Sequence, residues 1–153
     1  MGIHIENTWK PQWAWGTFYS NAGALQNIEE AGQFNPLVFA GSPSWVDVIG
    51  LTTATATGIA TFDFSGLYYV NANLSISGAT NDEFTLAFYK DGTTALDGGT
   101  TEWTQKGGNY WEVSIATLYR FLSNETLGIA IKNNEGELSP TLRNLTFNII
   151  KLY

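Results

Sequence analysis

The chain has 153 residues, the usual size of one domain, and its 44% hydrophobic, 14% aromatic and only 14% charged residues exclude a disordered chain. The absence of cysteine excludes disulfides, thiolate metal sites and cysteine nucleophiles, and the net charge of −7 disfavours nucleic-acid binding, because a phosphate backbone repels an acidic surface. No apolar run reaches the roughly 18 residues of a membrane helix, and the first ten residues do not resemble a secretion signal. We therefore expect no membrane association, and synthesis in the cytoplasm without a signal peptide.

Apolar residues recur at every second position through most of the chain, which is typical of β-strands with one buried face. The clearest case runs from Tyr68 to Ile76, where the positions between the apolar residues are mostly polar. By this pattern we expect strands, in chain order, at residues 13–20, 37–40, 45–51, 60–64, 68–76, 84–88, 111–119, 127–131 and 145–153.

Two segments do not follow the pattern. Residues 22–31 can hold at most one helical turn, because the segment is short, contains Gly23 and is followed directly by Gly32. The glycine- and threonine-rich residues 91–109 are expected to form a long loop, entered through the turn Asp91-Gly92. Turn signals spaced about 8–12 residues apart indicate an all-β antiparallel sandwich or barrel. We expect one domain over residues 13–153, preceded by an N-terminal arm over residues 1–12.

The final strand is apolar on both faces. Phe147 and Ile149 point to one side, whereas Ile150 and Leu152 point to the other. A strand with one wet face should not have this pattern. Either a loop of the same chain covers the second face, or another copy of the chain does.

Residues 58–70 (GIATFDFSGLYYV) resemble a hallmark of the tumour necrosis factor and complement globular-head superfamily, in which a phenylalanine-bearing strand leads through a glycine into a Gly-x-Tyr strand. Residues 74–78, 86–92 and 122–131 are similar to its following strands, and residues 147–152 to its final strand. Asn124-Glu125 stands where the family usually has Gly-Asp. The resemblance implies an antiparallel jelly roll of eight to ten strands, assembled as a homotrimer around a three-fold axis.

The same resemblance implies which positions line the three-fold axis and what the trimer does. Among members of the superfamily the chain is most similar in style to phage virion proteins, in which Ala14-Trp15-Gly16 would open the first strand. This implies a role in display, decoration or attachment. The axis-lining positions carried over from the family are Tyr69, Asn71, Ile115, Thr117, Asn148 and Ile150.

The residues give little support for catalysis, and we expect neither an enzyme nor a cofactor or metal site. His4 is the only histidine, so a general base with an orienting partner or a histidine metal site has no candidates. Glu102 and Glu112 each lie beside a tryptophan, but nothing in the sequence brings them together as a glycosidase pair. Acidic turns at residues 81–83, 91–97 and 135–137 lack the spacing of a calcium loop. They are expected to be ordinary turns, and calcium binding stays open.

Half of the six tryptophans, Trp9, Trp13 and Trp15, lie within the first fifteen residues. Tryptophan is enriched at interfaces, so we expect an arm that docks onto a neighbouring subunit or a larger particle. In the alternative, Trp13 and Trp15 begin the first strand and pack on the domain.

Together these observations favour a structural virion protein, located on the capsid surface or in a fibre. It would be a trimeric phage capsid decoration, cement or head-fibre protein that binds the major capsid protein or another virion protein. The alternative is a carbohydrate- or receptor-binding tip of a tail fibre, for which Trp103, Tyr110 and Trp111 are the candidate ligand residues.

Overall fold

The computed structural model describes residues 12–153 apart from residues 22, 27, 79–80, 106–109 and 137–138. The strands are β1 (Trp15–Ser20), β2 (Ala24–Leu25), β3 (Asn35–Pro36), β4 (Ser44–Ile49), β5 (Leu51–Ala54), β6 (Ile59–Phe62), β7 (Gly66–Ser77), β8 (Glu83–Lys90), β9 (Thr94–Thr104), β10 (Trp111–Phe121), β11 (Thr126–Asn133) and β12 (Thr141–Lys151). Within the described residues there is no helix. Accordingly, no described segment offers a helix long and apolar enough to cross a bilayer.

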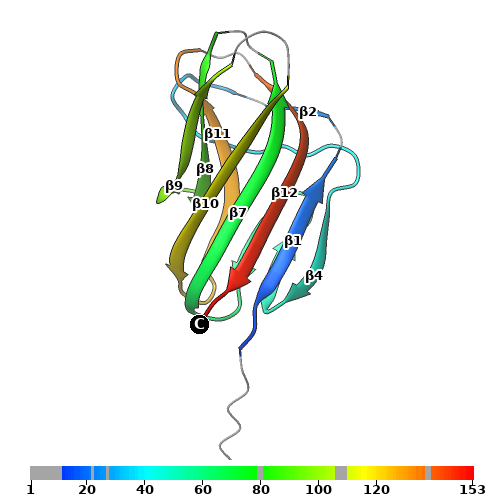
Figure 1. Ribbon diagram of the computed structural model, residues 1–153, viewed down its shortest axis with the longest axis vertical. Helices are drawn as coiled ribbons and strands as arrows, with labels where there is room; N and C mark the ends of the chain where they lie inside the picture. Colours follow the sequence, from blue (N-terminus) through cyan, green and yellow to red (C-terminus); the bar gives the residue numbers. More distant parts are fainter. Residues whose placement is uncertain (1–11, 22, 27, 79–80, 106–109, 137–138) are drawn as a thin grey trace, which may run out of the picture.

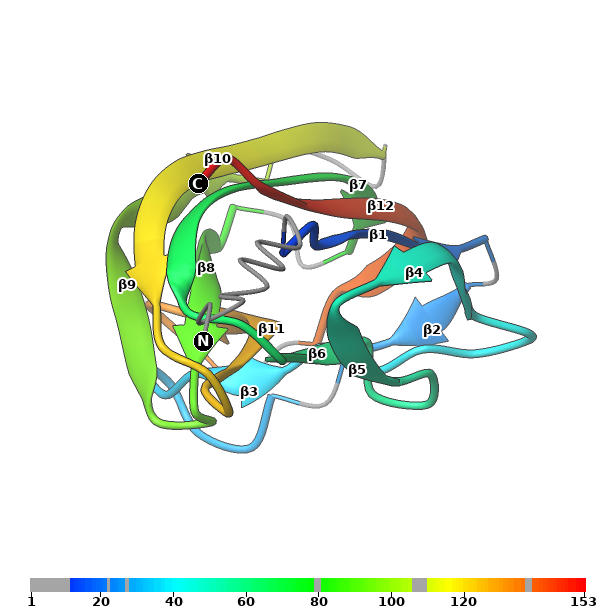
Figure 2. The same ribbon diagram turned by 90° about the horizontal axis from the view of Figure 1, so that it is seen from below.

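The strands form two antiparallel sheets that face each other, as the view along the strands shows (Figure 2). The first sheet has the order β10-β7-β12-β1-β4, with β2 paired to β12, and the second has the order β5-β6-β11-β8-β9, with β3 paired to β11. All neighbours on the path of the first sheet, and the pairs β6-β11 and β11-β8 of the second, are far apart in the chain, which is the connectivity of a jelly roll. The predicted all-β antiparallel jelly roll is therefore confirmed.

The core lies between the sheets and follows the predicted alternation. In β7 the side chains of Tyr68, Val70, Ala72, Leu74 and Ile76 are fully buried. Strand β8 is buried on both faces, with apolar residues from residue 84 to 88 interrupted only by a buried threonine. The periodicity found in the sequence thus fixes which face of β7 points inward.

The start of β7 is held by the end of the chain. The backbone N–H of Leu67 donates to the carbonyl of Tyr153 (2.7 Å), and the N–H of Leu152 donates to the carbonyl of Leu67 (2.8 Å). A Cβ on Gly66 would come within 2.6 Å of the Tyr153 carbonyl oxygen and would also overlap the side chain of Lys151. The glycine of the Gly-x-Tyr motif is therefore required by the close approach of the C-terminus.

One segment that was expected to be irregular is a strand in the structure. Residues 91–109 are not one long loop, because β9 occupies Thr94–Thr104 and pairs with β8. The segment has few apolar residues to reveal its alternation, and its Gly99 packs against Phe88, where a Cβ would lie only 3.1 Å from the ring. The turn at Asp91-Gly92 is confirmed, since both residues have positive φ (50° and 65°).

The N-terminal third also departs from the expected boundaries. Residues 24–25 form the short strand β2 instead of a helical turn, and the strand expected at residues 37–40 is replaced by β3 at Asn35–Pro36. Residues 45–51 divide into two strands of different sheets, because Gly50 adopts a φ of 64° and turns the chain between β4 and β5.

Tyr68 is the one buried tyrosine of the described core, and it supports a prediction on alkaline stability. Its hydroxyl donates to the carbonyl of Phe64 (2.6 Å). Burial, with a smaller contribution from the negative charge of Asp63, raises the pKa of Tyr68 to about 12. The neutral phenol is thus favoured by the fold, so its stabilising contribution is complete below the unfolded pKa near 10 and is lost as the pH rises from there to 12.

The variant Tyr68→Phe is expected to lower the free energy of unfolding by about 1 kcal/mol at pH 7, because the Phe64 carbonyl loses its partner. Between pH 10 and 12 the wild type should lose about 2 kcal/mol more than the variant, which has no phenol to ionise at this position. Urea unfolding at pH 7, 10 and 12 measures both effects. Parallel pH profiles for the two proteins would contradict the assignment of this titration to Tyr68.

Candidate functional site

The outer face of the first sheet carries a continuous row of large apolar side chains. Strand pairing places Leu118 beside Tyr69, Tyr69 beside Ile150, Ile150 beside Trp15, and Trp15 beside Ile49. This apolar row crosses β10, β7, β12, β1 and β4 and thus the full width of the sheet apart from the short β2. Ile150 at its centre is 45% exposed, so no loop in the described part of the chain covers it.

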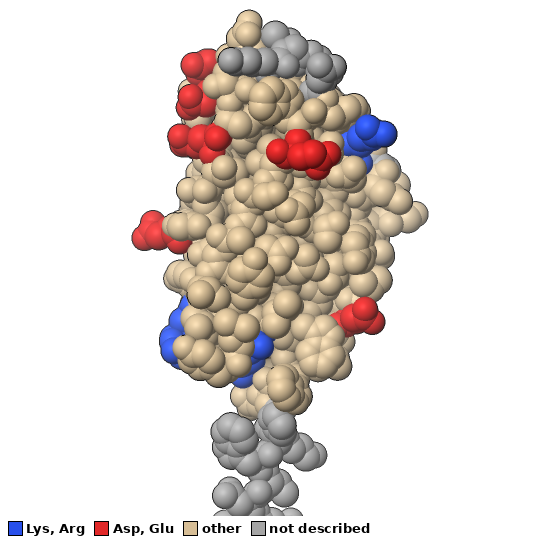
Figure 3. Space-filling view, in the orientation of Figure 1, with Lys and Arg blue, Asp and Glu red and all other residues tan. Residues whose placement is uncertain are grey.

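The next two rows on this face are uncharged as well. The second row reads Ala116, Asn71, Asn148, Thr17 and Val46, and the third reads Ser114, Asn73, Thr146, Tyr19 and Ser44. Figure 3 shows the same result at the surface, where the middle of the face has neither acidic nor basic side chains and the charged groups lie toward its edges. On a chain with a net charge of −7, this is a surface at which another molecule meets no charge.

Three polar side chains of the second row are joined by hydrogen bonds, and we call Thr17, Asn148 and Asn71 the amide row. The hydroxyl of Thr17 donates to Oδ1 of Asn148 (2.8 Å), and Nδ2 of Asn148 donates to Oδ1 of Asn71 (2.9 Å). These bonds hold the three side chains flat across β1, β12 and β7, immediately beside the apolar row.

Four of the six predicted axis-lining residues lie together on this outer face, namely Tyr69, Asn71, Asn148 and Ile150. The expectation that Ile115 and Thr117 also face outward is wrong. Ile115 is 5% exposed and belongs to the core, and Thr117 lies on the same side of β10, against Gly99 of β9. The prediction assigned the odd-numbered residues of β10 to the outer face. In the structure these alternating, mostly apolar residues face the core.

The sequence analysis missed Leu118, Ile49 and Val46, which contribute to the outer face at its two edges. Leu118 carries a signal that could have revealed it, because it is a large apolar residue at an even position of a strand whose odd positions fill the core. Ile49 and Val46 carry no such signal, since β4 has an irregular register against β1.

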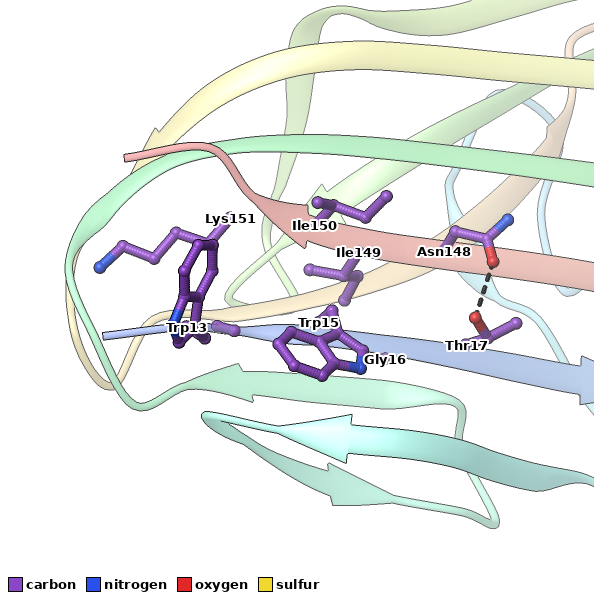
Figure 4. A pocket seen from close by; sticks show the side chains of 9 residues that line it. Trp13, Trp15, Gly16, Thr17, Asn148, Ile149, Ile150 and Lys151 are labelled. Atoms are coloured by element: carbon purple, nitrogen blue, oxygen red, sulfur yellow. Dashed lines mark hydrogen bonds between the residues drawn. The ribbon is translucent and has the colours of Figure 1, made fainter. Parts of the chain in front are cut away.

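At the lower end of the face, Trp13 and Trp15 of the predicted arm line an open hollow together with Ile150 and Lys151 (Figure 4). Trp13 is 59% exposed, but its backbone is fixed to the domain. The carbonyl of the adjacent Ala14 accepts a hydrogen bond from the N–H of Lys151 (2.7 Å). Trp15 is the first residue of β1, and Trp9 lies outside the described residues.

The three aromatic residues proposed for a ligand loop do not form one platform. Trp103 is half-buried and stacked on Phe84, with ring centroids 5.6 Å apart, so it packs against the core. Tyr110 and Trp111 are exposed at the end of the sandwich opposite the C-terminus, and the guanidinium of Arg143 lies 5.0 Å from the centre of the Tyr110 ring.

The acidic turns are engaged by neighbouring groups of the protein. The Nζ atom of Lys90 lies 2.8 Å from a carboxylate oxygen of Asp91 and 2.8 Å from one of Glu125. Asp91 also accepts a hydrogen bond from the N–H of Thr126 (2.7 Å). The hydrogen bond from Lys90 holds the pKa of Asp91 below its ordinary value. Glu102 accepts a hydrogen bond from the hydroxyl of Thr85.

In the described part of the chain, no three histidine, cysteine or acidic residues are grouped so that they could hold a metal ion. His4 lies outside that part, and Glu112 is exposed on the outer face of β10.

Comparison with known proteins shows the fold and nothing finer. No protein-family model and no curated protein sequence matches the chain. The globular domain of the zebrafish complement 1qA protein is similar over 92% of this chain and 98% of its own, with a TM-score of 0.65 and 15% identity. Eiger TNF from S. frugiperda (TM-score 0.65, 11% identity, 93% and 94% covered) and murine APRIL (TM-score 0.56, 12% identity, 90% and 99% covered) are similar too. The chain therefore has the jelly-roll fold of the complement globular head and the tumour necrosis factors.

Proposed function

We propose that the protein is a non-enzymatic attachment domain that works as a homotrimer, with the outer face of the first sheet as the contact between copies. The observation that carries the proposal is the uncharged face with the apolar row at its lower end. Removing such side chains from water contributes about 25 cal/mol per Å². A monomer would leave the apolar row exposed.

A second copy fits this surface better than a partner of another kind. A basic partner would be drawn to the acidic edges and not to the uncharged centre. Two copies of a chain with a net charge of −7 repel each other on average, and this repulsion is weakest where both present an uncharged face. Five strands about 4.8 Å apart and three rows give roughly 500 Å² per copy, a large part of the roughly 800 Å² per partner in a standard interface.

The finer proposal is that this trimer belongs to a phage particle, as a capsid decoration, cement or head-fibre protein. Its support is the sequence resemblance described above and the exposed Trp13, which lies close to the first described residue of the domain. The three solved structures named above are complement and tumour necrosis factor proteins and add nothing to this assignment. Three arms on one trimer would bind a capsid with avidity, and binding to the assembled shell alone would stabilise it.

The particle assignment is tested by purifying phage particles from cells that carry the gene and quantifying the chain by mass spectrometry. We expect a stoichiometric component. A variant without residues 1–11 should remain a trimer but be lost from the particles, because the arm supplies the contact with the capsid. Intact particles without the chain would contradict the virion role, and undiminished attachment of the shortened variant would contradict the role of the arm.

A further inference from the structure

The amide row has two chemically different ends. The Thr17 hydroxyl uses its proton toward Asn148, so its oxygen keeps lone pairs that can accept a hydrogen bond. At the other end, Asn71 uses Oδ1 as an acceptor, while its Nδ2 group has no acceptor among the described residues of the same copy. The row therefore runs in one direction across the sheet, with an accepting end on β1 and a donating end on β7.

The location of the row gives this direction a consequence. The amide row lies immediately beside the apolar row, so an interface that buries Ile150 and Tyr69 also removes water from Asn71. A buried amide without a partner weakens an equilibrium by a factor of about ten or more. Any arrangement of copies that leaves the Asn71 donor unpaired is disfavoured by that factor for each copy.

We infer that the amide row continues from one copy to the next, with Nδ2 of Asn71 donating to the hydroxyl oxygen of Thr17 in its neighbour. This inference rests on the proposed self-association and names the residues that set its register. A donor end that meets an acceptor end makes a head-to-tail contact, which generates a closed ring when the rotation between copies closes. The apolar row supplies affinity, whereas the amide row selects one arrangement, as single polar residues do in otherwise apolar interfaces.

The chain offers a closely matched pair of threonines for the test. Thr17→Val removes the accepting end with almost no change of shape, and Thr146→Val makes the same change on the third row, where the hydroxyl has no hydrogen-bond partner in the described structure. Asn71→Val removes the donating end. Thr17→Ser keeps a hydroxyl and serves as the rescue variant.

Native mass spectrometry and sedimentation velocity over a range of concentrations are the measurements, with circular dichroism to verify folding. We expect Thr17→Val and Asn71→Val to remain associated but to lose the single trimeric species, giving a distribution of masses. Thr146→Val and Thr17→Ser should keep the single species.

Two results would overturn the inference while self-association stands. One is a uniform trimer for both end variants, and the other is their dissociation to monomers, which would mean that the amides supply affinity and not register. A monomeric wild type would instead refute the proposed self-association itself.

Discussion

Replacing Ile150 by aspartate is expected to convert the proposed trimer to monomers at micromolar concentration. Ile150 lies at the centre of the apolar row, between Tyr69 and Trp15, and association would bury three carboxylates near one another. An unpaired buried charge costs several kcal/mol, which is enough to dissociate an interface of this size. The variant should still fold, because the Ile150 side chain is 45% exposed in the single copy.

Val38→Asp is the matched control, because Val38 has the same exposed fraction of 45% and lies next to β3, away from the outer face of the first sheet. Sedimentation velocity of both variants is the measurement. Only the Ile150 variant should sediment as a monomer, whereas the Val38 variant should keep the oligomeric state of the wild type. A trimer of unchanged stability in the Ile150 variant would exclude this face as the contact between copies.

Phe62→Ala is expected to produce the largest loss of stability of a single copy, about 3–5 kcal/mol. The Phe62 ring is fully buried and stacked on Phe121, with centroids 3.9 Å apart, and it meets the edge of Tyr68 at 4.6 Å. These rings join β6 of the second sheet to β7 and β10 of the first. Their removal leaves a cavity that the backbone of two sheets cannot close, and it also removes about 1 kcal/mol of ring–ring interaction.

Phe64→Ala provides the comparison, because Phe64 is two residues further on, half-buried at the end of the sandwich and covered on one side by Lys151. We expect a loss of less than half that of Phe62→Ala. Urea unfolding at pH 7, at a protein concentration where both variants have the same oligomeric state, measures the difference. Equal losses would contradict the central position of Phe62 in the core.

Much of the fold could be predicted because the core strands obey simple alternation. From Tyr68 to Ile76 the period of two identifies the buried face, and Asp91-Gly92 identifies a turn by its preference for positive φ. The strand β9 could not be predicted in this way. Its inward residues Leu96, Gly99 and Trp103 do not alternate, because its pairing with β8 shifts register between Ala87 and Tyr89. A glycine packed against a core ring also leaves no apolar signal in the sequence.

The candidate site could be predicted only in part, because a surface depends on which strands become neighbours. Ile150 could be recognised from its own strand alone, because it is an apolar residue on the face of β12 that points away from the core. Trp15 and Leu118 belong to the same apolar row only because β1 and β10 pair into one sheet across the chain. The wrong orientation predicted for β10 has a related cause. The positions were carried over from the family without the pairing register of β10, which determines whether its odd or its even residues face outward.

The most direct test of the account is the native mass of the unmodified protein from nanomolar to micromolar concentration. With a chain mass of 16.8 kDa, we expect the homotrimer as a single species of about 50 kDa at micromolar concentration. Hydrogen exchange on the same sample should show that the backbone amides at the two ends of the apolar row, at Leu118 and Ile49, are protected to the same degree as those of the core strands. A stable monomer of 16.8 kDa at micromolar concentration, with Ile150 accessible to solvent, would contradict it.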